Sequence, residues 1–216
     1  MNNININAAD EPVISPMATG KSSIMIVAGE LSGDMHAAKL VEELKQKMPG
    51  THFFGVGGPA MRSAGVETLY DIREMAVMGF WAVLPKIGFF KSVLRHMLTL
   101  AKLRSPHAAI LVDYPGFNLR LAEKLKSMNI KVIYYICPQV WAWNRRRIPK
   151  MAQTIDKLIT IFPFEKKYFD KTGLSVTFVG HPLTEISKDM ANKFTAKLPW
   201  HGSPKIALLP GSRPHV

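Results

Sequence analysis

Two carboxylates in this sequence directly follow short apolar runs, at positions where an enzyme could use them for proton transfer. Asp113 comes after the run Ala108 to Val112, and Glu30 follows Ile24 to Ala28 with one glycine between. A carboxylate beside a partly buried loop can act as a general base and remove a proton from an attacking hydroxyl. The alternative for Asp113 is structural, as an acceptor for backbone amides of its own loop. Both roles stay open for Asp113, whereas Glu30 has no evident structural role and is expected to be functional.

Small residues lie near both carboxylates, as in loops that let a ligand approach the backbone. Ser32 and Gly33 precede a helical pattern, and Gly57 and Gly58 follow the next apolar run. Glycine permits close approach to the backbone, and the free amides at the start of a helix bind anions. We expect substrate contacts at these four positions. A plain strand-to-helix turn is the alternative for the two glycines at 57 and 58.

Three further polar side chains stand at similar positions. Asp34 lies near a helix start, where an N-cap is its expected role. Asn118 follows the turn Pro115-Gly116 and is expected to cap the next helix and to contact substrate. His181 follows an apolar run and is expected to face the ligand crevice at the carboxyl ends of the strands, although a lone histidine is more often structural.

A third stretch combines aromatic and cationic residues. Trp141 and Trp143 precede the cations of Arg145 to Lys150. Such a combination suits sugar stacking, phosphate contact, the headgroup zone of a membrane or single-stranded nucleic acid. Cys137, nearby, lacks an obvious base partner and is expected to be a packed thiol.

The chain has no acidic residue between Met75 and Val112. Within this stretch a broad apolar helical face is bordered only by cations, which is typical of a helix that binds anionic lipid. A core helix with a solvated edge is the alternative. The residues expected to contact membrane or acyl chains are Phe80, Trp81, Phe89, Phe90, Lys91 and Arg95.

The elements that position these residues alternate between strand and helix. Seven apolar runs predict strands at Ile24 to Ala28, His52 to Gly55, Ala108 to Val112, Lys131 to Ile136, Leu158 to Phe162, Val176 to Val179 and Lys205 to Leu209. Helical patterns lie at Asp34 to Lys47, Phe89 to Arg104, Leu119 to Ser127, Arg146 to Gln153 and Glu165 to Lys171. Strands that are continuously apolar and alternate with helices predict an α/β fold, a doubly wound Rossmann-like parallel sheet, with ligands beyond the carboxyl ends of the strands.

Composition bounds the remaining possibilities. The 216 residues are 47% hydrophobic and carry a net charge of +12, which favours a polyanionic partner such as nucleic acid, an anionic membrane or a phosphorylated substrate. One cysteine excludes an internal disulfide framework and a cysteine-cluster metal site. The start of the chain lacks the features of a signal peptide, and no apolar run reaches the ~18 residues of a membrane span, so the cytoplasm is the expected location.

The expected domain organisation has four parts. Residues 1–22 read as a flexible polar leader and 23–187 as the N-terminal, Rossmann-like domain. Residues 188–204 are polar with two prolines near their end, which indicates a linker. Residues 205–216 then provide the first strand and loop of a second domain.

Eight motifs together carry a family resemblance. In order along the chain they are "AGELSGDMHAA", "GVGGPAM", "MAVMGF", "VDYPGFN", "PQVWAW", "FPFEKKYF", "FVGHPL" and "LLPGSR". With these motifs the chain, from about Ile24 to Arg213, resembles the lipid-A-disaccharide synthase family of inverting glycosyltransferases. The resemblance implies a GT-B arrangement, in which two Rossmann-like domains face each other across a cleft.

The resemblance also implies a reaction and its partners. The family joins a UDP-2,3-diacylglucosamine donor to a 2,3-diacylglucosamine 1-phosphate acceptor and releases UDP, with no metal and no other cofactor. Asp113 matches the base toward the acceptor's 6-hydroxyl, Glu30 matches a glutamate needed for activity, and Arg213, after Ser212, matches an arginine associated with the donor's phosphates. The basic apolar stretch matches the region that meets the cytoplasmic face of the inner membrane as a peripheral protein.

The end of the chain adds an expectation of its own. "LLPGSR" opens the second domain in the family, so the donor half is expected to be largely missing and the chain alone to be inactive. Two alternatives remain: another GT-B enzyme, such as a nucleotide-sugar epimerase or a peptidoglycan glycosyltransferase, and a basic nucleic-acid-binding module that uses Trp141 to Lys150. The second predicts steeply salt-dependent binding to DNA or RNA, but no nucleic-acid partner is expected.

Overall fold

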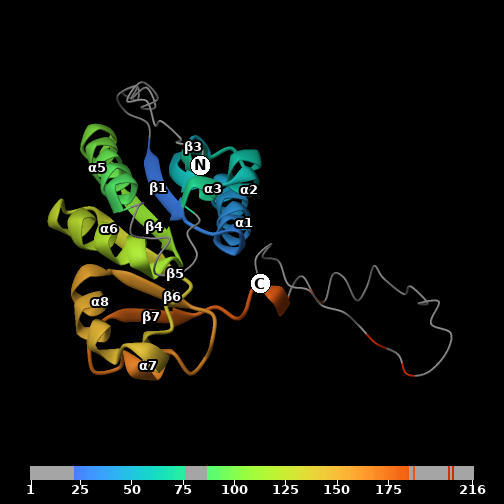
Figure 1. Cartoon of the computed structure of the whole chain (residues 1–216), viewed down its shortest axis with the longest axis vertical. Coiled ribbons are helices and arrows are strands. Elements are labelled where there is room, and N and C mark those ends of the chain that lie inside the picture. Colours follow the sequence, from blue (N-terminus) through green and yellow to red (C-terminus); the bar gives the residue numbers. More distant parts are fainter. Residues whose placement is uncertain (1–21, 76–86, 185–186, 188–203, 205, 207–216) are drawn as a thin grey trace, which may run out of the picture. The chain divides into compact units, whose positions relative to one another are not determined.

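A computed structural model of the chain describes residues 22–75, 87–184, 187, 204 and 206 and shows one parallel β-sheet flanked by helices (Figure 1). The sheet has seven strands in the order β3-β2-β1-β4-β5-β6-β7, and every neighbouring pair is parallel. The strands are β1 (Ser23–Ala28), β2 (His52–Gly57), β3 (Glu67–Asp71), β4 (Ala108–Val112), β5 (Lys131–Tyr135), β6 (Lys157–Thr160) and β7 (Ser175–Phe178). This confirms the predicted α/β, Rossmann-like parallel sheet.

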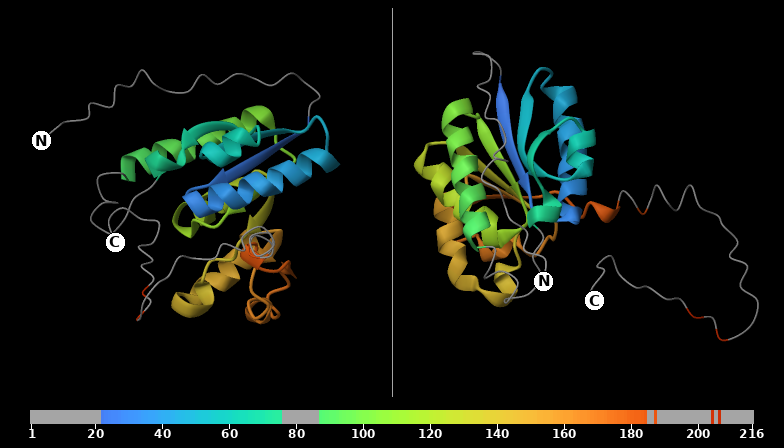
Figure 2. Two further views of the ribbon diagram at one scale, coloured as in Figure 1. Left: turned by 90° about the vertical axis from the view of Figure 1, so that its right-hand side faces the viewer. Right: turned by 45° about the horizontal axis from the view of Figure 1, so that its top comes forward.

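Helices cover both faces of the sheet, with α1 and α2 on one side and α5 and α6 on the other (Figures 1 and 2). The described helices are α1 (Leu31–Lys47), α2 (Pro59–Ser63), α3 (Ile72–Met75), α5 (Ile87–Arg104), α6 (Pro115–Ser127), α7 (Val140–Trp143) and α8 (Ile148–Thr154). Two 3-10 turns, η2 (Arg145–Arg147) and η3 (Lys166–Tyr168), complete the described elements. None of the described helices has the length and apolar character that crossing a membrane requires.

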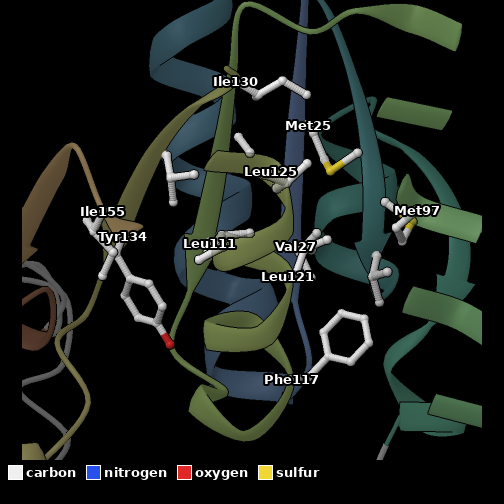
Figure 3. Close-up of a cluster of buried hydrophobic side chains, with 14 of the residues drawn as sticks. Met25, Val27, Met97, Leu111, Phe117, Leu121, Leu125, Ile130, Tyr134 and Ile155 are labelled. Atoms are coloured by element: carbon white, nitrogen blue, oxygen red, sulfur yellow. The ribbon is translucent and has the colours of Figure 1, made fainter. Parts of the chain in front are cut away.

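The larger part of the core lies beneath α5, α6 and α8. Figure 3 shows Val27 and Leu111 of neighbouring strands packed with Leu121 and Leu125 of α6. All six residues of β1 are buried, as continuous hydrophobicity predicts for a central parallel strand. The sheet therefore provides a rigid base for the loops at its carboxyl ends.

The strand order reverses between β1 and β4. From β1 the chain proceeds outward to β2 and β3, then crosses back to β4 and proceeds outward in the other direction to β7. Such a reversal separates the two connecting loops and opens a crevice at the carboxyl ends of the strands, where ligands of open α/β sheets bind.

The element predictions differ from the described structure at one strand and one helix, and they omitted the short helices α2, α3 and α7. Glu67–Asp71 was not expected as a strand, yet it forms the edge strand β3. Glu165 to Lys171 was expected as a helix, but only the 3-10 turn η3 forms there. The predicted strand Lys205 to Leu209 lies almost entirely outside the described residues.

The chain divides into two compact units, residues 1–181 and 182–216. Everything described below belongs to the first unit. The expected leader at 1–22 and linker at 188–204 fall almost wholly outside the described residues, so the expected boundaries stay predictions.

A partly buried ion pair fixes helix α5 to the edge strand β3. The Arg104 guanidinium donates to both carboxylate oxygens of Glu67, at 2.7 and 2.9 Å, and lies 4.8 Å from the ring centre of Phe54. The Arg104 side chain is 2% exposed and the Glu67 side chain 39%. The hydrogen bonds from Arg104 lower the pKa of Glu67.

Candidate functional site

Glu30 and Asp113 lie at the reversal of strand order. Ala28 of β1 pairs with Val112 of β4, and the two carboxylates follow these residues by two positions and one position. They are close enough that the charge of Glu30 contributes to the raised pKa of Asp113. The structure thus brings together two residues that are 83 positions apart in the chain.

The loop that carries Asp113 is held in an unusual backbone conformation. Asp113 and Tyr114 both have positive φ angles, of 46° and 49°, and Ile136 at the end of the neighbouring β5 has a φ of 68°. Aspartate tolerates this region moderately well, but a β-branched isoleucine rarely adopts it. Strained residues persist where their surroundings hold them, each at a cost of about 1–3 kcal/mol, and they gather at functional sites.

Hydrogen bonds from distant residues hold this conformation. The Tyr134 hydroxyl donates to the Asp113 carbonyl at 2.6 Å, and the Asp113 N–H donates to the Tyr135 carbonyl at 3.0 Å. Asn118 is fully buried, and its amide donates to the carbonyls of Val112 and Asp113 at 3.2 and 2.9 Å. Figure 3 shows the Tyr134 ring in the core with its hydroxyl directed to the loop before α6. The backbone of Asp113 is therefore fixed, while its side chain remains half-buried at the edge of the sheet.

The contacts of Asn118 are those of a loop support. It lies inside α6 rather than at its N-cap, which is Tyr114. The expectation that Asn118 caps this helix was therefore wrong. Its expected contact with substrate stays a prediction, and one that would have to act through the loop it holds.

Tyr114 explains why a glycine precedes Glu30. A Cβ atom at position 29 would overlap the ring of Tyr114, whose hydroxyl donates to the Met75 carbonyl at 2.8 Å. The ring thus packs on the backbone directly before Glu30. Close packing between the two loops therefore requires glycine at this position.

Burial is the main cause of the raised pKa of Asp113, and repulsion from Glu30 is the second. The Tyr114 N–H opposes both effects by donating to the carboxylate. A carboxylate with raised proton affinity, half-exposed at a crevice, is suited to general-base catalysis near neutral pH. Glu30 is exposed, and no side-chain hydrogen bond from it caps α1, so its carboxylate faces solvent beside Asp113.

Asp34 has a different role from the expected one. It does not cap its own helix, because α1 begins at Leu31 and Asp34 lies within its first turn. Its fully buried carboxylate instead accepts hydrogen bonds from the N–H groups of Gly58, Ala60 and Met61, at 2.7, 3.0 and 3.1 Å. The prediction of an N-cap for α1 was thus wrong, and the side chain caps α2 across a long-range contact.

This cap also explains the glycines after β2. Gly57 and Gly58 are both buried, and a Cβ at position 58 would come within 2.7 Å of an Asp34 carboxylate oxygen. The alternative of a strand-to-helix turn therefore describes the packing of these two glycines. Ser32, which is exposed, and Gly33, which is buried, both lie in the first turn of α1, beside Glu30. Substrate contacts at these four positions stay predictions.

Comparison with known proteins gives a direct answer on the family. The profile of a family described as lipid-A-disaccharide synthetase matches residues 24–215. A Myxococcus xanthus protein named lipid-A-disaccharide synthase is 44% identical over 198 residues, which cover 90% of this chain and 52% of that protein. A protein of the same name from Anaeromyxobacter sp. (strain K) is 45% identical over 202 residues, covering 93% and 52%. Lipid-A-disaccharide synthase 1 of Legionella pneumophila is 44% identical over 197 residues, covering 89% and 51%.

The chain belongs to the lipid-A-disaccharide synthetase family. It spans about half the length of the curated relatives it matches. The family resemblance predicted from the eight motifs is thereby confirmed.

His181 reaches the same end of the sheet from the far edge strand. Its ring centre lies 5.3 Å from that of Phe162, which follows β6. Its charge also acts on His36 of α1, whose pKa is lowered chiefly by burial and secondly by His181. Within this member of the lipid-A-disaccharide synthetase family, His181 therefore lies near α1, although its contact with substrate is still a prediction.

An aromatic cluster lies beyond β5 and β6. Trp141 packs edge-on against Phe164 at 5.0 Å between ring centres and stacks on Tyr168 at 6.3 Å. Arg145 donates to the Trp141 carbonyl at 2.9 Å and lies over the Tyr168 ring. Cys137 is buried, and burial raises the pKa of its thiol far above the ordinary value, so it is a packed thiol as expected.

The apolar face of α5 points mainly into the protein. Val93, Met97 and Leu100 are fully buried, so the alternative of a core helix holds for them. Phe89 and Phe90 are partly buried against the same core, whereas Lys91 and Arg95 are exposed. The expected acyl-contact residues Phe80 and Trp81, and the donor-site residues Ser212 and Arg213, lie outside the described residues.

Sequence reasoning missed the residues that support the site. Tyr134 and Tyr114 were not singled out, although a tyrosine in an otherwise apolar strand signals a hydroxyl that needs a partner. Glu165 was also missed, and it supports the loop after β6: its carboxylate is buried and accepts the Phe162 N–H at 3.1 Å. Among the described residues no group of three or more His, Cys, Asp or Glu side chains could hold a metal ion.

Proposed function

We propose that this chain provides the acceptor-side domain of a lipid-A-disaccharide synthase with the GT-B arrangement, on the cytoplasmic face of the inner membrane. The proposed donor is UDP-2,3-diacylglucosamine and the proposed acceptor 2,3-diacylglucosamine 1-phosphate. The observation that carries the proposal is the Asp113–Glu30 pair at the reversal of strand order, in a chain of this family.

The proposed reaction is an inverting glycosyl transfer. Asp113 takes the proton of the acceptor's 6-hydroxyl as the oxygen attacks the anomeric carbon of the donor. The bond from that carbon to the UDP oxygen breaks, and UDP leaves with the electron pair. In this proposal Ser212 and Arg213 hold the donor's phosphates, and cations and helix starts stabilise the departing charge.

The fixed backbone of Asp113 supports this role. A general base must lie within hydrogen-bond distance of the proton it removes, and small displacements lower the rate strongly. Tyr134 and Asn118 restrain the Asp113 carbonyl, so the backbone that carries the carboxylate keeps its position when an acceptor enters. Glu30 keeps the proton affinity of Asp113 high, since two neighbouring negative charges disfavour each other.

Disaccharide synthesis by a chimera tests the proposal. The chimera joins this chain to the remaining half of the Myxococcus xanthus relative, and that relative is assayed in parallel as a reference. We expect the chimera to form disaccharide 1-phosphate and UDP from the two proposed substrates. A folded chimera that forms no product, while the reference does, would contradict the proposal.

The chain by itself provides a second comparison. Because it spans about half the length of its relatives, we propose that it forms little or no disaccharide without the remaining half. Turnover by the purified chain at the rate of the chimera would show that the acceptor half suffices.

A further inference from the structure

A hollow of about 220 Å³ lies between α6 and α8, the two helices labelled in Figure 1. Neither Glu30 nor Asp113 belongs to its lining. Leu119 and Met151 provide its apolar lining, while Arg120, Arg147 and Lys150 bring cations to it from α6, η2 and α8. The volume is below the ~300 Å³ of the smallest typical drug-sized pockets, so the hollow suits a small charged group better than a whole lipid.

The cations of this hollow are not all neutralised. Glu123, also in the lining, forms an ion pair with Lys150 at 2.7 Å and balances the charge of that lysine. Arg120 and Arg147 form no ion pair within the part of the chain that the structure describes. The hollow therefore presents two guanidinium groups that can bind an anion.

The start of α6 adds to this charge. Pro115 and Gly116, at the start of the helix, belong to the lining, and no acidic residue occupies the first turn. At this end of the helix Pro115 has no N–H, and the N–H groups of Phe117 and Asn118 donate to the Tyr114 carbonyl, which leaves the Gly116 N–H for a ligand. This amide and the helix dipole favour an anion there. Two guanidinium groups beside a helix start are suited to a phosphate, which arginine binds through paired hydrogen bonds.

The position of the hollow relative to Asp113 indicates which phosphate-bearing molecule it could bind. Pro115 follows Asp113 by two residues, so their Cα atoms are at most about 7 Å apart. In a hexose 1-phosphate, the carbon that bears the phosphate and the carbon that bears the 6-hydroxymethyl group flank the same ring oxygen. A sugar whose 6-hydroxyl lies at Asp113 must place its phosphate within one ring's width of that carboxylate.

We propose that the hollow between α6 and α8 binds a phosphomonoester through Arg120, Arg147 and the start of α6. Two molecules offer this chemistry, a sugar 1-phosphate and the headgroup of phosphatidic acid. The identification of the ligand as the acceptor's 1-phosphate rests on the proposed function; the binding of a phosphomonoester does not.

NMR titration of the labelled chain tests the site. Glucosamine 1-phosphate and short-chain phosphatidic acid are added separately, and the signals of the Gly116 amide and the arginine Nε–H groups are followed. We expect the double variant Arg120→Gln, Arg147→Gln to bind the phosphomonoester at least about tenfold more weakly than the parent, because charge-assisted hydrogen bonds are lost. Arg146→Gln is the matched control, since Arg146 lies in the same 3-10 turn but not in the lining.

The two probes separate the sources. Binding of glucosamine 1-phosphate that depends on both arginines identifies a sugar-phosphate site, and arginine-dependent binding of phosphatidic acid alone identifies a headgroup site. Unchanged affinity of the double variant for both probes, or no response of these signals to either, would overturn the proposal. Since all three arginines are exposed, circular dichroism is expected to show unchanged folding.

The chimera tests the phosphate site separately from the proposed function. If the hollow binds the acceptor's phosphate, the double variant of the chimera has a KM for the acceptor about tenfold or more higher and a kcat that changes little. An inactive chimera whose labelled chain still binds glucosamine 1-phosphate through both arginines would contradict the proposed function and leave the phosphate site standing.

Discussion

At the scale of single residues, the site depends on how two carboxylates influence each other. Burial and the charge of Glu30 raise the pKa of Asp113, while Tyr134 and Asn118 hold its backbone. Proton affinity and position are thus set by different neighbours, so they can be altered separately.

Replacing Glu30 tests the electrostatic part. In the variant Glu30→Gln the repelling charge is gone, so we expect the pKa of the Asp113 carboxyl to fall. Burial remains, so the pKa stays above the ordinary aspartate value of about 3.9. The measurement is a carbon-13 NMR titration of the aspartate carboxyl groups in the chain.

The control is Glu43→Gln, an exposed glutamate near the other end of α1, which is expected to leave the Asp113 titration unchanged. A pKa of Asp113 that is the same with and without Glu30 would mean that the two carboxylates do not interact.

At the scale of elements, long-range polar contacts connect neighbouring helices and strands. Asp34 of α1 caps α2, and Arg104 of α5 pairs with Glu67 of β3. Both contacts are buried on at least one side, so removing the carboxylate takes a charged hydrogen-bond acceptor from groups that lie away from water.

Removing the Asp34 carboxylate tests the first contact. Asp34→Ala leaves three amides without their charged acceptor, and we expect the free energy of unfolding to fall by about 3 kcal/mol. Urea unfolding followed by circular dichroism measures it. Asp170→Ala, at an exposed position, is expected to change it by less than about 0.5 kcal/mol. A loss for Asp34→Ala no larger than that control would contradict the capping role.

Removing the Glu67 charge tests the second contact. Because Arg104 is the more deeply buried partner, Glu67→Gln removes the negative charge beside a buried guanidinium and is expected to cost about 3 kcal/mol at neutral pH. Arg73→Gln, which breaks an exposed pair with Asp71, is expected to cost less than about 1 kcal/mol.

The stabilisation that the Glu67–Arg104 pair provides is expected to decrease in acid. The folded-state pKa of Glu67 is lowered, so the pair stabilises the protein above the unfolded glutamate pKa of about 4.3, and this stability is lost as the pH falls through the folded value. The difference between parent and Glu67→Gln should therefore shrink in acid. A difference that stays constant down to low pH would contradict the ion-pair account.

The sequence predicted every central strand and one of the two edge strands. Five described strands lie inside the sheet and were predicted from continuous apolar runs, because a central parallel strand is buried on both faces. The edge strand β7 was also predicted, although it is mostly exposed. The edge strand β3, "ETLYD", begins and ends with an acidic residue and is only half-buried, so it lacks that signal. The expected functional positions of Glu30 and Asp113 followed from strand ends alone. The cap from Asp34 and the bond from Tyr134 could not be predicted, since they join residues 24 and 21 positions apart.

At the scale of the whole molecule, a net charge of +12 favours binding of the protein to an anionic surface. The exposed cations of α5 are next to the partly buried Phe89 and Phe90. The proposed membrane contact therefore makes α5 the helix whose charge matters most for adhesion.

Charge reversal on α5 tests that contact. The double variant Lys91→Glu, Arg95→Glu is expected to bind phosphatidylglycerol vesicles at least about tenfold more weakly, since each cation near such a surface contributes about 1 kcal/mol. Vesicle sedimentation measures it. The control Lys39→Glu, Lys47→Glu makes the same change in net charge on α1. Equal weakening in both variants would mean that net charge alone, and not α5, governs binding.

The position of Asp113 also predicts a conflict between stability and function. Its raised pKa means that the ionised carboxylate destabilises the folded state, increasingly as the pH rises through the folded-state value. Asn is tolerated at a positive φ, so Asp113→Asn keeps the loop and removes the charge.

The rate of disaccharide formation by the chimera with Asp113→Asn, measured beside the parent and the Asp170→Asn control, is the most direct test of the catalytic assignment. The account predicts a rate about 10²–10⁴-fold lower with no loss in the free energy of unfolding at pH 7, because a general base is missing from an intact site. A folded Asp113→Asn chimera that works within about threefold of the parent rate would contradict the account, since so small an effect leaves no role for a general base.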